Sequence, residues 1–184
     1  MQAAEACFAS QGYDATGLAE ICQQAGVSKG ALYHHFASKQ DLFLALLNAW
    51  LERIDAQIET IRAESPDVTA AMLHMVEVLS PIFQERKGQL PIIFEFWIKA
   101  GRDPAIWRAA IAPYRRYRDY FAAMIQAGVD QGTLCADDPE LVAQMLVSLV
   151  VGLLLQGLLD SDETDWGDVA QRSVRTLLQG LKEN

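Results

Sequence analysis

Cysteine is scarce in this chain of 184 residues, and its three cysteines form no recognisable pattern. They stand at positions 7, 22 and 135 without a Cys-x-x-Cys spacing, which excludes a disulfide framework and a zinc knuckle. The first residues, from Met1 to Phe8, also lack the basic segment and the long apolar run of a secretory signal. We therefore expect a protein of the cytoplasm, which is a reducing compartment.

Positive charge is also in short supply. The formal net charge is -9 and the sequence pI is near 4.7. Such a balance excludes a protein whose whole surface binds nucleic acid or an anionic membrane. Any binding of that kind must be confined to a small part of the surface.

Several motifs of common enzyme and metal sites are missing. There is no Gly-rich loop of the phosphate-binding type and no His-Glu-x-x-His pair. The neighbouring His34 and His35 would point about 100° apart on a helix, and no Cys, Asp or Glu completes a metal-ligand set with them. We expect no catalytic residue, no cofactor and no metal ion.

Helical spacing of apolar residues recurs along the chain, whereas strict alternation and Asn-Gly or Asp-Gly hairpin signals are nearly absent. The sequence therefore predicts an all-α fold. Glycines predict helix ends at Gly12 and Gly26. Hydroxyl residues predict helix starts at Thr16, Ser28 and Ser38. A fifth helix is expected to begin near Ser65-Pro66-Asp67 and to run to about Lys87.

The segment from Leu141 to Leu159 contains no charged residue over a length that could span a bilayer. Acidic residues flank it on both sides, whereas a membrane span is typically flanked by basic or aromatic residues. We interpret it as a helix covered on one side by its own domain and on the other by a second subunit. With the final helix it is expected to form a four-helix dimer interface that contains Gln144, Ser148, Gly152, Gln156, Val169, Val174 and Leu177.

Residues 16–34 form two short predicted helices joined by a glycine turn, as in a helix-turn-helix. The segment from Ala25 to Phe36 reads AGVSKGALYHHF and is followed by Ser38-Lys39. This segment, within Gly12 to Lys39, closely resembles the signature of the TetR (tetracycline repressor) family. The detailed resemblance covers about residues 1–50.

The resemblance implies a helix-turn-helix DNA-binding domain over residues 1–48 and an effector-binding and dimerisation domain over residues 49–184. It places Thr16, Ser28, Tyr33, His34 and Lys39 where the family holds phosphates, and Lys29, Gly30 and Ala31 where it meets base edges. Residues 1–50 contain two cations, Lys29 and Lys39, against four acidic residues. Family members usually carry a basic arm before this point, so we expect the natural chain to extend upstream with a basic segment.

The central helices, over residues 67–131, are rich in aromatic side chains. Most of these must belong to the core, but cavities between helices are common ligand sites. We expect a small apolar or aromatic effector there, with His74, Trp97, Trp107, Tyr117 or Phe121 in the wall. A hydrogen-bonded core histidine is the simpler interpretation of His74.

Together these features predict a homodimeric, ligand-responsive transcriptional regulator, a repressor, that binds a palindromic operator and is released by its effector. The alternative is a helical small-molecule-binding protein whose incomplete DNA-binding module does not function. A third possibility is an α-helical hydrolase.

Overall fold

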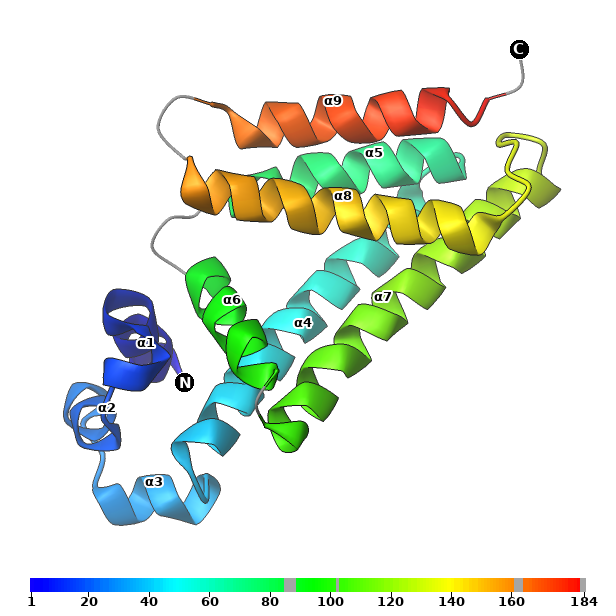
Figure 1. Ribbon diagram of the computed structural model, residues 1–184. Helices are drawn as coiled ribbons and strands as arrows, with labels where there is room; N and C mark the ends of the chain where they lie inside the picture. Colours follow the sequence, from blue (N-terminus) through cyan, green and yellow to red (C-terminus); the bar gives the residue numbers. More distant parts are fainter. Residues whose placement is uncertain (85–88, 102, 161–163, 183–184) are drawn as a thin grey trace. The chain divides into compact units, whose positions relative to one another are not determined.

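The computed structural model describes residues 1–84, 89–101, 103–160 and 164–182. In these residues it contains helices and no strand, so the all-α prediction is confirmed (Figure 1). The elements are α1 (Gln2–Ala15), α2 (Leu18–Ala25), α3 (Lys29–His35), α4 (Lys39–Glu64), α5 (Val68–Leu79), the 3-10 helix η1 (Ser80–Gln84), α6 (Gln89–Ala100), α7 (Pro104–Asp130), α8 (Pro139–Leu159) and α9 (Trp166–Gln179).

Local capping chemistry accounts for three helix ends in the first fifty residues. Gly26 ends α2 in the left-handed conformation, with φ 67°. The Ser28 hydroxyl caps α3 by accepting from the Ala31 N–H at 3.1 Å. At the start of α4 the Ser38 hydroxyl caps the helix by accepting from the Asp41 N–H, and it donates in turn to the Asp41 carboxylate.

The fifth helix ends earlier than expected. It stops at Leu79 rather than near Lys87, and η1 follows. Pro81 explains the difference, because it has no N–H to continue the helical hydrogen bonds, and the Ser80 N–H goes to the Glu77 carbonyl in a tighter turn. At its other end α5 begins as predicted, with the Asp67 carboxylate accepting from the Ala70 N–H at 2.8 Å.

The chain divides into two compact units. Unit 1 comprises residues 1–54 and 86–111, and unit 2 comprises residues 55–85 and 112–184. The long helices α4 and α7 each contribute residues to both units. These are packing units, so the functional boundary expected after residue 48 stays a prediction.

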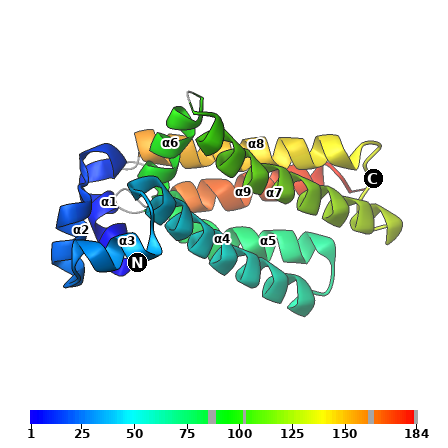
Figure 2. The ribbon, with the colours of Figure 1, turned by 90° about the horizontal axis from the view of Figure 1, so that it is seen from below.

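In unit 1, α1 packs against α2 and α6, α3 packs against α2, and Leu42 and Phe43 from the first part of α4 join the same core. Phe8 of α1 is almost fully buried, and its ring lies edge-on to that of Phe43. Phe96 of α6 extends the aromatic cluster, at 4.7 Å between its ring centre and that of Phe43. The helices α1, α2 and α3 lie together as a compact group (Figure 2).

In unit 2, α5, α8 and α9 lie side by side (Figure 1). Leu153, Trp166 and Ala170 form part of its core. By length and composition alone, α8 is apolar enough to cross a membrane. In the structure one side of α8 is buried, with Val142, Ala143 and Leu146, whereas the other side exposes Leu141 and Leu159.

Candidate nucleic-acid interface

The outer face of α3 is the surface best suited to meet DNA. Lys29, Gly30, Ala31, Tyr33 and His34 are all exposed, and the Tyr33 side chain is 53% exposed. An unpaired ammonium, a phenol and an imidazole can each hold phosphate or a base edge. Small residues at positions 30 and 31 leave the start of the helix free to approach a groove closely.

A single apolar anchor holds this short helix to unit 1. Leu32 is buried, whereas its neighbours Ala31 and Tyr33 are exposed. Ile21 and Cys22 of α2 belong to the same core cluster. The left-handed turn at Gly26 then sets the angle at which the chain leaves α2 for α3. Because Leu32 packs into the core on one side of α3, the polar side of the helix faces the solvent.

The segment from Gly26 to Gly30 also has the letters of the Gly-x-Ser-x-Gly motif of hydrolases. That motif needs a sharp strand-to-helix turn to expose its serine. Here Ser28 stands between two helices and its hydroxyl caps α3. The local structure lacks the geometry of a nucleophile elbow.

Thr16 differs from its prediction. The N-cap of α2 is Gly17, not Thr16. The Thr16 side chain is 1% exposed, and its hydroxyl donates to the carbonyl oxygens of Gly12 at 2.7 Å and Cys7 at 3.1 Å. The Gly12 carbonyl lies at the break in α1, where helical partners run out, so the hydroxyl turns inward. It is not presented at the surface for a phosphate.

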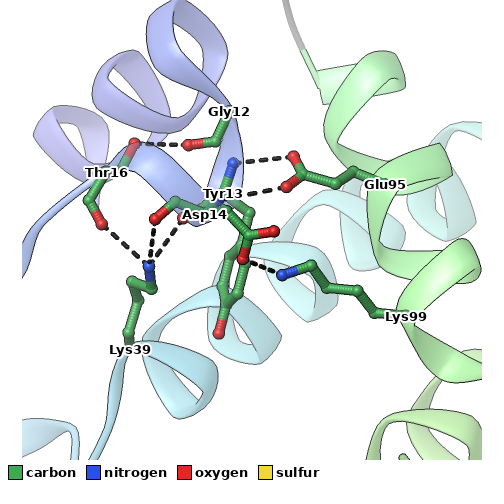
Figure 3. A network of polar contacts seen from close by, with 7 residues as sticks. All are labelled: Gly12, Tyr13, Asp14, Thr16, Lys39, Glu95 and Lys99. Atoms are coloured by element: carbon green, nitrogen blue, oxygen red, sulfur yellow. Dashed lines mark hydrogen bonds and ion pairs between the residues drawn. The ribbon is translucent and has the colours of Figure 1, made fainter. Parts of the chain in front are cut away.

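Lys39 also differs from its prediction. Its ammonium donates to three carbonyl oxygens, those of Tyr13 at 2.9 Å, Asp14 at 3.2 Å and Thr16 at 3.0 Å (Figure 3). An ammonium has three N–H donors, so all of them are used. A phosphate contact would require Lys39 to give up one of these bonds.

Sequence reasoning missed two charged residues of α6 that meet the same backbone segment. The Glu95 carboxylate accepts from the backbone N–H groups of Tyr13 and Asp14, and the Lys99 ammonium pairs with the Asp14 carboxylate (Figure 3). The available signal was their spacing. They are the only charged residues between Gln89 and Ala100 and stand four apart, so they share one face of an otherwise apolar helix.

The five residues expected to bind an effector fall in both units. Trp97 and Trp107 belong to unit 1 and are exposed, whereas His74, Tyr117 and Phe121 belong to unit 2. His74 is exposed on α5, so its interpretation as a core histidine is wrong. The pattern around it misled because α5 buries Met72 and Met75 on another face. The effector assignment stays a prediction.

A pocket of about 150 Å³ lies in unit 1 instead, between α1, α4 and α6. Phe8, Phe43, Leu46 and Trp50 contribute to its wall. None of the five expected effector residues does. Its size is comparable to cavities that hold a benzene-sized molecule.

The expected dimer residues are only partly on the surface. Val174 is completely buried within unit 2, so its assignment to a subunit interface is wrong. The stripe of α9 on which it lies packs against its own protomer. Gln144 is half-buried and donates to the Tyr114 hydroxyl at 2.7 Å. Ser148 and Gln156 are exposed, and Gly152, Val169 and Leu177 are half-buried.

The exposed apolar side of α8 overlaps only in part with the residues that the sequence indicated, which are Gln144, Ser148, Gly152 and Gln156. Its members recur every three or four residues and share one face. We call this set the α8 stripe: Leu141, Met145, Ser148, Gly152, Leu155 and Leu159. The Leu159 side chain at its end is 75% exposed.

Comparisons with known proteins agree with this architecture. Residues 1–46 match the family described as bacterial regulatory proteins, tetR family, and residues 68–182 match the BetI-type transcriptional repressor, C-terminal family. The transcriptional repressor AcnR of Corynebacterium diphtheriae is 28% identical over 96% of this chain and 90% of its own length.

Solved structures share the fold. A TetR transcription regulator from Haloarcula marismortui superposes with a TM-score of 0.87 and 22% identity, over 99% of this chain and 95% of its own. A regulator from Saccharomonospora viridis, solved in complex with choline, gives a TM-score of 0.85 and 21% identity, over 100% of this chain and 95% of its own. With the α2–turn–α3 geometry and the two sequence matches, these findings identify the chain as a member of the TetR family of helix-turn-helix transcriptional regulators.

Proposed function

We propose that this regulator is a repressor that binds a palindromic operator as a homodimer and is released by a small effector. The observation that carries the proposal is the outer face of α3, where exposed polar and small residues are held outward by the buried Leu32. The match to the BetI-type repressor family and the similarity to the repressor AcnR support repression rather than activation. The protein acts in the cytoplasm and needs no catalytic activity for this role.

DNA contacts divide into two kinds. Ser28, Tyr33 and His34 hold phosphate oxygens, and Gly30 and Ala31 let the start of α3 approach base edges. Lys29 is the one cation of residues 1–50 that the structure leaves available, because Lys39 is used internally. Binding therefore depends more on hydroxyls, rings and helix ends than on charge.

The partner subunit covers the α8 stripe. Its apolar side chains are exposed in the protomer, and covering them would remove a continuous hydrophobic strip from water. A two-fold dimer brings the same strip from each chain together. Two copies of α3 then meet two half-sites about one helical turn apart.

We keep an apolar or aromatic molecule as the class of the effector. Choline is a second candidate, because it occupies the related Saccharomonospora viridis structure and because aromatic rings attract quaternary ammonium groups. The coupling element is α4, a continuous helix that begins in unit 1 and ends in unit 2.

An electrophoretic mobility shift with the DNA upstream of the protein's own coding sequence tests this function. The wild-type chain is expected to shift that DNA at a lower concentration than a scrambled duplex. Lys29→Ala is expected to weaken the shift, whereas Lys182→Ala, which removes the same charge at an exposed site in unit 2, leaves it unchanged. A wild-type chain that binds choline or an aromatic ligand but shifts no DNA would instead favour the alternative of a ligand-binding protein.

A further inference from the structure

The last turn of α1, after the break at Gly12, contains backbone polar groups that the helix does not satisfy. Gly12 has φ 82° and ψ 167°, which interrupts α1 before its last residues. We call residues 12–16 the α1–α2 junction. Backbone N–H and C=O groups that lose helical partners must find others. In the junction, side chains from distant parts of unit 1 supply them.

The N–H groups of the junction are held by one carboxylate of α6. Glu95 Oε2 accepts from the Tyr13 N–H at 2.8 Å, and Glu95 Oε1 accepts from the Asp14 N–H at 3.2 Å. Two successive N–H groups can bind an anion together. Gly12 fits this approach, since a Cβ there would lie 3.3 Å from Glu95 Oε2.

The carbonyl groups of the junction are held from the other side by Lys39, which donates to three of them. The Tyr13 ring lies between two ammonium groups, with Lys39 Nζ and Lys99 Nζ each 4.6 Å from its centre. The junction is thus fixed by an acid on its donors and by a cation on its acceptors. α2 begins directly after it and leads through Gly26 into α3.

We propose that Glu95 is a positioning residue for DNA binding, which holds the α1–α2 junction and through it the placement of α2 and α3. Lys39 is its counterpart and acts on the junction carbonyls rather than on phosphate. This proposal rests on the proposed DNA-binding function, and it assigns a part in that function to a helix outside the helix-turn-helix.

The Glu95→Gln variant distinguishes positioning from simple filling of space. A glutamine has the same shape but offers one acceptor oxygen, so its NH2 group faces one of the two junction N–H groups. Loss of a charge-assisted hydrogen bond of this kind corresponds to about tenfold in affinity. We expect Glu95→Gln to weaken binding to the upstream duplex by about that factor.

The sign of this effect is informative. Removing a negative charge from a DNA-binding unit should, by electrostatics alone, tighten binding to a polyanion. Glu52→Gln, at an exposed position of α4 in unit 1, removes the same charge away from the junction. We expect this control to bind as the wild type or slightly more tightly. Amide hydrogen exchange at Tyr13 and Asp14 should accelerate in Glu95→Gln and not in Glu52→Gln.

Lys39→Met tests the other side of the junction. Loss of a phosphate contact reduces the steepness of log affinity against log salt by about 0.9 per contact. We expect Lys39→Met to weaken binding while the slope stays close to the wild-type value. Lys29→Met, at the exposed start of α3, should reduce the steepness instead.

The proposal is overturned if Glu95→Gln binds DNA as well as the wild type, or if its amide exchange at residues 13 and 14 does not change. A measurement on the wild type alone covers the case of a variant that does not fold. Its Tyr13 and Asp14 amides should be protected from exchange relative to the amide of Asp137, which is exposed in the loop before α8, and unprotected amides would also overturn the proposal. A wild-type chain that binds no DNA but protects these amides contradicts the proposed function and leaves the junction contacts intact.

Discussion

The role of a side chain in this protein depends on the groups within its reach. For Tyr33 the expected partner is the phosphate backbone of DNA. Its ring lies on the outer face of α3 and is half-exposed, so its hydroxyl is free to reach phosphate. We expect Tyr33→Phe to weaken binding by about threefold to tenfold, the range for one hydrogen bond. The loss should be equal for operator and scrambled duplexes, because phosphate contacts carry no sequence information. Fluorescence anisotropy with both duplexes measures it, and a loss confined to the operator would mean that Tyr33 reads a base.

Tyr117 shows the same dependence inside unit 2. Its hydroxyl donates to the Asp55 carboxylate at 2.8 Å, and Arg116 pairs with the other oxygen of Asp55. Burial, followed by this bond to Asp55, raises the pKa of Tyr117 well above its ordinary value. The folded protein therefore keeps a proton that the unfolded chain loses above about pH 10.

The stability associated with Tyr117 is fully present below the unfolded pKa and is lost as the pH rises above it. Tyr117→Phe removes the hydrogen bond and should lower the free energy of unfolding by about 1–3 kcal/mol near neutral pH. The ordinary pKa of a tyrosine is about 10. Between about pH 9 and about pH 11 the variant should therefore lose less free energy of unfolding than the wild type. Urea unfolding across this range tests both statements. Equal pH dependence in the two proteins would show that Tyr117 is not the group responsible.

At the scale of elements, α8 has one buried and one exposed apolar side. One side packs in unit 2, and the other exposes the α8 stripe. In the described part of the chain, apart from the backbone of α8 itself, nothing lies within 4 Å of a Cβ at Gly152, so a first added carbon there has room within the protomer. We therefore expect disruption by a larger residue there to come from a second molecule.

We expect Gly152→Leu to weaken the dimer, because the small residue permits close approach of the two helices. Sedimentation at micromolar concentration should show the wild type at twice the chain mass of 20.4 kDa and the variant shifted toward the monomer. Gln131→Leu, at an exposed position after α7, is the matched control and should sediment as the wild type. A wild type that sediments as a monomer would exclude the dimer.

At the scale of the whole molecule, DNA and effector must affect each other equally if they favour different states. A ligand in hundredfold excess over its dissociation constant should stabilise the fold by about 2.7 kcal/mol. A thermal shift screen of fatty acids, acyl thioesters, aromatic drugs and choline should therefore raise the melting temperature for at least one class. The same compound should weaken DNA binding, and bound DNA should lower the affinity for the compound by the same factor. A compound that binds without changing DNA affinity is not the effector.

Local chemistry made most of the fold predictable. Gly26, Ser28 and Ser38 act on groups within a few residues of themselves, and each behaves as its neighbours in the sequence imply. Pro81 shows the limit of that reasoning, because a helical apolar pattern continued past it while the backbone did not. The face of α3 that carries polar and small residues was also predictable from the sequence, because the cap, the anchor Leu32 and the exposed residues lie within one short segment.

The sequence by itself determined that this protein is all-helical, where several of its helices begin and end, and which segment resembles a DNA-reading helix. Only the tertiary structure decided what Thr16, Lys39 and Val174 do, and it brought Glu95 to a backbone 82 residues away. The physical reason is the separation along the chain between the groups that bond. Caps and turns use partners nearby in the chain, whereas a hydroxyl, an ammonium or a carboxylate bonds to whichever unsatisfied group the packing of distant helices places within reach.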